Sequence, residues 1–266
     1  MMTAPGVGPL LRQWRKARRM SQQQLALASE VSARHISFVE NGKSAPSREM
    51  VLILANALEM PLRERNTLLR SAGFAPVYRE SALSDPEMSA VREILEIILQ
   101  HHEPYPAVVV DHEWNLVQAN PAAGRVLTHF LASPSVGVEN LMHALFHPEG
   151  LRQFVVNFEE VASIVVDRLY REALIEPDGN PADRLLRDLR QYEGVVPRLR
   201  SIDLAAPPKV AIPLHLRRGT VEVRLLSTIT TFGTALDVTA QELRIESYFP
   251  ADDESRRWVA SLSAKA

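Results

Sequence analysis

The chain has 266 residues, of which 46% are hydrophobic and 23% charged, so it can bury a sizeable core in two domains and disorder is not expected. No run reaches the roughly 18–20 apolar residues of a membrane helix, and residues 1–8 lack the basic start and apolar stretch of a secretory signal, so a cytoplasmic protein without a membrane partner is expected. The absence of cysteine excludes disulfides, thiolate zinc sites and cysteine nucleophiles.

The charge is distributed unevenly along the chain. The formal net charge of the whole chain is −2, yet residues 1–70 contain 11 Lys and Arg against 5 Glu, which gives this part a net charge of +6. The rest of the chain therefore carries −8. Only the first quarter is predicted to attract a polyanion.

Residues 10–72 read as five short helices separated by polar turns, without strand-like alternation. In the first helix, Leu10 and Trp14 share an apolar face, and most of the basic residues lie around the other side. Ser21 and Gln24 form the S-x-x-Q pattern in which each side chain satisfies the other's backbone N–H, so a second helix is predicted to begin there.

A third helix is predicted from about Ser32, whose hydroxyl can cap it, to Glu40. Ile36 and Val39 lie on its inner face. Asn41-Gly42 ends it, because both residues tolerate the left-handed backbone of a helix terminus.

The following segments connect this region to the rest of the chain. A fourth helix is predicted after Pro46-Ser47, a fifth near Pro61, and a linker over residues 73–84. Asp85-Pro86 then opens a longer helix that runs to about His102. The predicted domains are residues 1–75, a connecting segment at 76–103, and residues 104–266.

The periodicity then becomes extended. Tyr105 to Asp111 and Trp114 to Ala119 indicate a hairpin, although its turn holds no glycine. Helical patterns follow at residues 120–131, 138–146, 150–175 and 182–192, and extended segments at residues 209–217, 220–231 and 237–249. This order predicts an α+β domain with an antiparallel sheet covered by helices, and it matches the element order of PAS-like sensor domains.

The segment SQQQLALASEVSARHISFVENGKSAPS, residues 21–47, resembles the helix-turn-helix of the XRE family over its full length. The physical logic agrees, since two helices joined by a tight turn must pack through small or apolar residues such as Leu25, Ala26 and Val31. The resemblance implies a sequence-specific transcription regulator that binds double-stranded DNA, and the N-terminal domain is therefore expected to be an all-α, five-helix DNA-binding domain.

The outer face of the third helix is predicted to read bases in the major groove. Its candidate base-contacting residues are Ser32, Ala33, Arg34, Ser37 and Phe38. The planar fork of Arg34 matches the O6 and N7 acceptors of guanine, while Ala33 and Phe38 suit a thymine methyl. Gln22, Asn41 and Lys43 resemble the family's phosphate-contacting set and are expected to hold register.

Four further runs, at residues 47–81, 101–123, 146–162 and 227–252, resemble the MmyB-like regulators in order along nearly the whole chain. The resemblance implies a PAS-like ligand-binding domain, and a fatty acid as the class of ligand. From the residues alone, an apolar pocket with a few polar groups would suit an acyl chain.

Eight residues of the second domain are candidates for ligand contacts. Five of them lie in the predicted sheet and its helical cover and would line the pocket: Trp114, Asn120, Phe154, Phe158 and Phe232. The other three, His147, Arg152 and Asn157, could contact a polar head group. Core packing is the open alternative for the aromatic residues, and a surface or helix-end position for the polar ones.

No enzyme is expected. His143 and His147 have the helical spacing of two metal ligands, but no glutamate base or third ligand accompanies them, so no metal is expected. No dinucleotide, P-loop or G-x-S-x-G motif supplies a cofactor site or a catalytic residue.

A homodimer is expected from the way helix-turn-helix proteins read symmetric operators. The apolar stripe of the connecting helix, with Val91, Ile94, Leu95, Ile98 and Leu99, either pairs two subunits or packs within one. A second domain that serves only dimerisation or protein docking remains the alternative function.

Overall fold

The computed structural model describes residues 6–131, 137–175, 180–193, 195 and 213–263. The chain forms two compact units. Unit 1 consists of the described residues within Met1–Ser81, Glu172–Asn180 and Thr234–Gln241, and unit 2 of those within Ala82–Arg171, Pro181–Gly233 and Glu242–Ala266. Unit 1 therefore contains two segments, residues 172–180 and 234–241, that are distant in sequence from the N-terminal helices. A division of the chain into consecutive domains would assign both segments to the second domain. Among the described residues, no helix combines the length and apolarity needed to span a bilayer.

Unit 1 begins with the five helices that the sequence predicts. They are α1 (Val7–Ala17), α2 (Gln22–Ser29), α3 (Ala33–Glu40), α4 (Arg48–Ala57) and α5 (Leu62–Ser71). Their apolar faces meet in one core, in which Trp14, Leu25, Ile36, Leu54 and Leu69 are fully buried. Burial of this kind stabilises helices that would be too short to persist alone.

Side-chain caps define where these helices begin. The Ser21 hydroxyl accepts from the Gln24 backbone N–H at 3.1 Å, and Gln24 Oε1 accepts from the Ser21 N–H at 2.7 Å, which confirms the capping box. The Ser32 hydroxyl accepts from the His35 N–H at 3.2 Å at the start of α3. The third helix predicted from Ser32 to Glu40 is thus confirmed, with Ser32 as its cap.

Gly8 allows α1 to approach the end of α3 closely. A Cβ atom built at Gly8 would lie 2.4 Å from the Val39 carbonyl oxygen and 2.8 Å from that of Glu40. Gly8→Ala is therefore expected to destabilise unit 1 by about 1–3 kcal/mol, because backbone atoms must move to admit the methyl group. Urea denaturation measures this loss. Gly6→Ala is the matched control, since nothing lies within 4 Å of its Cβ position, and equal losses in the two variants would refute the packing argument.

The connection between the last two strands also contributes to unit 1. Its helix α12 (Val238–Glu242) is capped by Asp237, whose Oδ1 accepts from the Thr239 N–H at 2.9 Å. Gln241 Oε1 accepts from the Leu62 N–H at 2.8 Å, at a helix start that has no cap of its own. The sequence prediction of an extended segment from residue 237 is wrong for α12, because the Asp237 cap favours a helical turn there.

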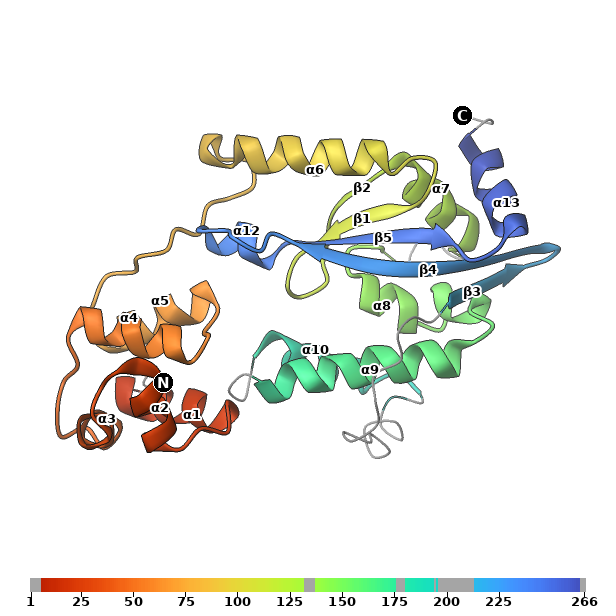
Figure 1. The fold of residues 1–266 in the computed structure, drawn as a ribbon. Coiled ribbons are helices and arrows are strands. Elements are labelled where there is room, and N and C mark those ends of the chain that lie inside the picture. Colours follow the sequence, from red (N-terminus) through yellow and green to blue (C-terminus); the bar gives the residue numbers. More distant parts are fainter. Residues whose placement is uncertain (1–5, 132–136, 176–179, 194, 196–212, 264–266) are drawn as a thin grey trace. The chain divides into compact units, whose positions relative to one another are not determined.

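Unit 2 is built on one five-stranded sheet (Figure 1). Its strands are β1 (Ala107–Val110), β2 (Leu116–Ala119), β3 (Pro213–Arg218), β4 (Val221–Thr231) and β5 (Arg244–Pro250), in the order β2-β1-β5-β4-β3 with every pair antiparallel. The α+β class and the predicted hairpin are confirmed. Residues 209–212 of the predicted third strand lie outside the described residues.

Helices cover both faces of this sheet. The remaining described helices are η1 (Pro86–Met88), α6 (Ser89–His101), α7 (Pro121–Phe130), α8 (Leu141–Phe146), η2 (Leu151–Phe154), α9 (Phe158–Ile175), α10 (Pro181–Leu189) and α13 (Asp253–Ser263). Figure 1 shows α6 on one side of the sheet and α8 and α9 on the other. Leu95 and Leu99 of α6 pack on Ala107, Val109 and Ile245, which leaves the alternate residues of β1 and β5 to face α8 and α9.

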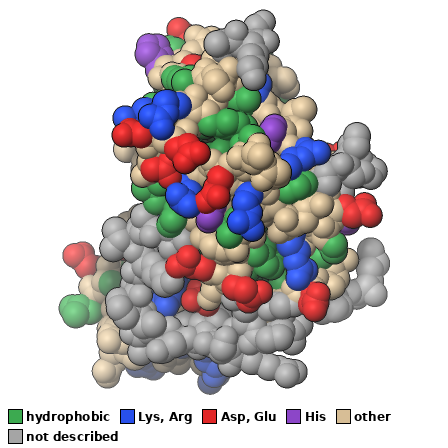
Figure 2. Space-filling model, turned by 90° about the vertical axis from the view of Figure 1, so that its right-hand side faces the viewer, with side chains coloured by type: hydrophobic (Ala, Val, Ile, Leu, Met, Phe, Trp, Pro, Cys, Tyr) green, Lys and Arg blue, Asp and Glu red, His purple; other side chains and the backbone are tan. Residues whose placement is uncertain are grey.

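One further predicted helix differs from the structure. The predicted helix over residues 150–175 is broken between η2 and α9, because Val155 pairs with Leu216 of β3 and the Asn157 side chain bonds to the β3 backbone. Helix α13 was not predicted. Figure 2 shows acidic and basic side chains interspersed among the described residues of one face.

Candidate functional site

The five residues predicted to read bases are the N-cap of α3 and four residues of the helix itself. Ser32, Arg34 and Phe38 are exposed, and Ala33 and Ser37 are half-buried. The guanidinium carbon of Arg34 lies 5.3 Å from the centroid of the Phe38 ring, one helical turn away. This stacking holds the guanidinium plane on the surface of the helix.

A buried ion pair joins α1, α2 and α3. Arg15 donates to Glu40 through Nε at 2.6 Å and through Nη2 at 2.8 Å, and Gln22 Nε2 donates to Glu40 Oε2 at 2.8 Å. Burial alone would raise the pKa of Glu40, but hydrogen bonds from Arg15 and Gln22, together with the charges of Arg15 and Arg12, lower it. The sequence predicts that most basic residues of α1 lie on its outer side, but it gives no local signal for the pairing of Arg15 with Glu40, which lies 25 residues away.

The residues predicted to contact phosphate flank α3. Gln22 is held by Glu40, which leaves the second hydrogen of its amide nitrogen for another acceptor. Asn41 Nδ2 donates to the Ser37 carbonyl at 2.7 Å and to the Ser37 hydroxyl at 3.3 Å, so it caps the last turn of α3. Lys43 is exposed just beyond that turn.

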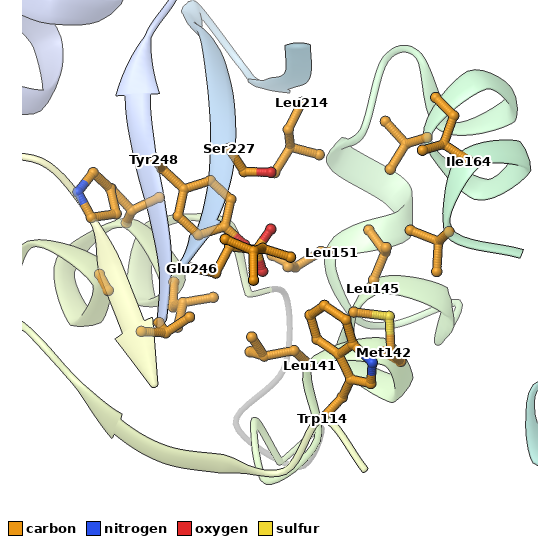
Figure 3. Close-up of a pocket in the computed structure, with 18 of the residues that line it drawn as sticks. Trp114, Leu141, Met142, Leu145, Leu151, Ile164, Leu214, Ser227, Glu246 and Tyr248 are labelled. Atoms are coloured by element: carbon orange, nitrogen blue, oxygen red, sulfur yellow. The ribbon is translucent and has the colours of Figure 1, made fainter. Parts of the chain in front are cut away.

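Unit 2 contains a cavity of about 460 Å³ between the sheet and α7, α8 and α9 (Figure 3). Its volume lies within the range of small-molecule sites. Apolar side chains form most of the wall; those from the helices include Ala123, Val126, Leu127, Leu141, Met142, Leu145, Val161, Ile164, Val165 and Leu169. The α9 members recur at helical spacing, so one face of α9 lines the cavity between residues 161 and 169.

Polar groups from the sheet gather on one side of this cavity. Figure 3 shows Ser227 of β4 and Glu246 and Tyr248 of β5 pointing into it. Ser227 lies opposite Tyr248, and Glu246 lies opposite Ile229, in the β4–β5 register. Both hydroxyl groups hydrogen-bond with the Glu246 carboxyl group, and the charge of Arg168 on α9 also acts on it.

Glu246 is 8% exposed, and burial raises its pKa above the ordinary value although Ser227, Tyr248 and Arg168 partly oppose the shift. Burial and the neighbouring carboxyl group also raise the pKa of Tyr248. Sequence reasoning missed this group. The available signal was an acidic residue inside the otherwise strand-like run RIESYF, where period-two alternation puts residues 246 and 248 on one face.

Trp114 is the predicted ligand residue that lines the cavity. It lies in the β1–β2 turn with φ +68°, a left-handed conformation that is costly for a bulky residue. It occupies the place that glycine takes in many hairpin turns. The guanidinium carbons of Arg168 and Arg244 lie 4.6 Å and 5.3 Å from its ring centroid, and these contacts help to hold the strained backbone in place.

The two predicted asparagines bond to backbone instead of lining the cavity. Asn120 accepts from the N–H groups of Ala107 and Ala123, each at 2.9 Å, and its Nδ2 donates to the Tyr105 carbonyl at 2.8 Å. Asn157 donates to the Pro213 carbonyl at 2.7 Å and accepts from the His215 N–H at 3.0 Å. Asn120 thus connects the start of α7 to β1, and Asn157 connects the start of α9 to β3.

The other five predicted ligand residues also lie outside the cavity wall. Phe154 packs against Phe130, and Phe158 against Phe146. Phe232 belongs to the core on the α6 side of the sheet, the opposite face. The remaining two pack elsewhere: Arg152 over the Phe158 ring at 4.8 Å, and His147 edge-on to Tyr192. Aromatic composition could not distinguish core from cavity, because both are apolar.

The histidine pair considered as metal ligands meets a tyrosine in the structure. His143 Nδ1 lies 3.1 Å from the Tyr192 hydroxyl, and the His147 ring centroid is 6.0 Å from that of Tyr192. Burial raises the pKa of Tyr192. These contacts indicate packing between α8 and the end of α10.

Comparisons with known proteins place these observations in a family. Residues 91–262 match the MmyB-like transcription regulator ligand binding domain, and residues 11–65 match a helix-turn-helix family. No curated protein matches. A solved structure described as that of an RNA-binding light-oxygen-voltage receptor aligns with 98% of this chain and 62% of its own, at 14% identity and a TM-score of 0.29. The chain spans less than two thirds of that protein, and the likeness is too low to carry an argument. The match over residues 91–262 covers most of the chain, which therefore belongs to the MmyB-like transcription regulators.

Proposed function

We propose that this protein is a sequence-specific DNA-binding regulator whose second unit holds a small apolar ligand, of which a fatty acid is the class suggested by family resemblance. The observation that carries the proposal is the cavity of about 460 Å³, lined mostly by apolar side chains, in a chain that also has a helix-turn-helix. The β2-β1-β5-β4-β3 order supports a PAS-like sensor fold for unit 2.

The competing function is a second unit that serves only dimerisation or protein docking. A well-packed unit without a cavity would favour it, so the cavity weighs against it. Most of the predicted apolar stripe of α6 packs within one chain, since Leu95 and Leu99 are buried and Val91 and Ile98 pack beside them. Ile94 is the member that stays exposed. A homodimer stays a proposal, and sedimentation of the free and DNA-bound protein tests it.

The ligand is tested directly on the full chain. Native mass spectrometry of protein from its own host, followed by lipid extraction, should reveal a bound apolar molecule. The delipidated protein should then change its DNA affinity when that molecule is restored, because a ligand biases DNA binding only if it prefers one arrangement of the protein. Unchanged DNA affinity would refute sensing, and a ligand-free protein under all conditions would support the docking alternative.

Arg34→Ala is expected to weaken specific DNA binding by about 1–3 kcal/mol and to relax the preference at one base pair, because a bidentate guanine contact is lost. Affinity measurements on a set of single-base operator variants report both effects. An unchanged base preference would contradict the assignment.

Lys43→Ala is the matched contrast to the Arg34 variant. It should weaken binding to all sequences alike and reduce the salt dependence of affinity by about one unit of slope, because a phosphate contact is lost while no base contact changes. The measurement is the affinity for specific and random duplexes across a salt series. A loss confined to the specific operator would contradict the phosphate role.

A further inference from the structure

The polar side of the cavity contains a carboxyl group that the proposed function leaves unused. Glu246 faces Ser227 and Tyr248 on the sheet and Arg168 on α9, and Arg244 lies two residues earlier on the same strand. The side chains that β1, β3, α7 and α8 contribute to the cavity are apolar: Val108, Ala123, Val126, Leu127, Leu141, Met142, Leu145, Leu214 and Leu216. Among the described lining residues, charge is therefore confined to Glu246 and Arg168.

This arrangement decides which head groups can be buried next to Glu246. Arg168 can offset the negative charge of an ionised Glu246. A ligand carboxylate beside it would add a second negative charge in a volume from which the ligand displaces most of the water. Two carboxylates in one such place retain a proton between them, because the free energy of the doubly ionised form is too high. A hydroxyl, ester or amide head group adds no charge and meets donors and acceptors on Ser227, Glu246 and Tyr248.

We propose, resting on the ligand-binding function proposed above, that this cavity selects single-chain amphiphiles whose head group adds no net charge, either a neutral alcohol, ester or amide or a fatty acid bound together with one proton, and that Glu246 imposes this selection. The carboxyl group thus acts as the specificity-determining residue of the site. The apolar wall holds the chain irrespective of the head group.

A pH dependence follows for acids alone. The pKa of Glu246 is raised in the free protein, and a bound carboxylate raises it further, so an acid binds with uptake of a proton. Affinity for the acid therefore falls as the pH rises, by up to tenfold per pH unit for one linked proton. A neutral ligand of the same chain length adds no charge beside Glu246, so its affinity should not change with pH.

The test compares tetradecanoic acid with 1-tetradecanol on the delipidated full chain between about pH 5 and about pH 9, by competition with a fluorescent lipid probe. In the wild type, acid affinity should fall with pH while alcohol affinity stays constant within about twofold. In Glu246→Gln the acid should lose most of its pH dependence and bind at least tenfold more tightly than in the wild type at the alkaline end. Glu254→Gln removes an exposed carboxylate from α13, and it should behave like the wild type.

A calorimetric measurement keeps the proposal testable even if Glu246→Gln does not fold. Titrations of the wild type in two buffers of different ionisation enthalpy should show about one proton taken up with the acid and none with the alcohol. Equal pH profiles for the acid in the wild type and in Glu246→Gln, or no proton uptake, would overturn the role of Glu246 while leaving ligand binding intact. If neither lipid binds, both this inference and the apolar-ligand function are overturned.

Discussion

Glu40→Ala is expected to destabilise unit 1 by about 3–5 kcal/mol, because it leaves the Arg15 guanidinium buried without its carboxylate partner. The exposed fractions of the two side chains are 11% for Arg15 and 2% for Glu40, so little water can replace the lost contact. Gln22 loses its acceptor as well. Urea denaturation followed by Trp14 fluorescence measures the loss, in a background where Trp114 and Trp258 are replaced by phenylalanine, since Trp14 lies in the unit 1 core.

The stability lost in Glu40→Ala should also depend on pH. The pKa of Glu40 is lowered from the ordinary value of 4.5, so its ionised form stabilises the folded state above that value. This contribution is lost as the pH falls through the lowered pKa. The difference in unfolding free energy between wild type and variant should therefore be complete near neutrality and shrink in acid.

An apolar replacement of both partners controls for charge burial. Arg15→Met with Glu40→Leu removes the pair without leaving an isolated charge, and it should recover most of the stability lost in Glu40→Ala. A loss below about 1 kcal/mol in Glu40→Ala would show that the pair is effectively solvated. If Gln22 contacts a phosphate as the sequence predicts, the DNA affinity of the folded double variant reports whether that contact depends on Glu40.

Asn120→Ala is expected to destabilise unit 2 by about 2–5 kcal/mol and to leave ligand selectivity unchanged. Asn120 is 3% exposed, and its side chain pairs with the Ala107 and Ala123 N–H groups and with two backbone carbonyls. Removing the amide leaves these buried groups without partners and uncaps α7. Thermal denaturation of the full chain measures the effect.

Asn120→Asp distinguishes the contribution of the side-chain acceptor from that of the side-chain donor. It keeps an acceptor for the two N–H groups but lacks the amide donors to the Leu99 and Tyr105 carbonyls, so it should recover part of the loss. If Asn120 instead contacted ligand, both variants would reduce lipid affinity at full stability. That result would restore the expectation from the sequence that Asn120 is a ligand residue.

Local signals were sufficient for the recognition helix. Ser21 with Gln24, Ser32 as a cap, and the Asn41-Gly42 terminus each act within one helical turn, so their geometry follows from nearest neighbours along the chain. The family resemblance of the second domain likewise stands. For the ligand contacts, composition indicated an apolar pocket, and of the eight named residues the structure puts Trp114 in its wall.

What the sequence by itself determined is the unequal charge, the capped helices of unit 1, the alternation that forms an antiparallel sheet, and the family. What only the tertiary structure decided is which partners meet across long separations. Arg15 meets Glu40, Gln241 caps α5, and Glu246 shares a cavity with Arg168. The physical reason is that helix caps and strand alternation depend on residues a few positions apart, whereas burial of a charged group depends on elements brought together only by the complete fold.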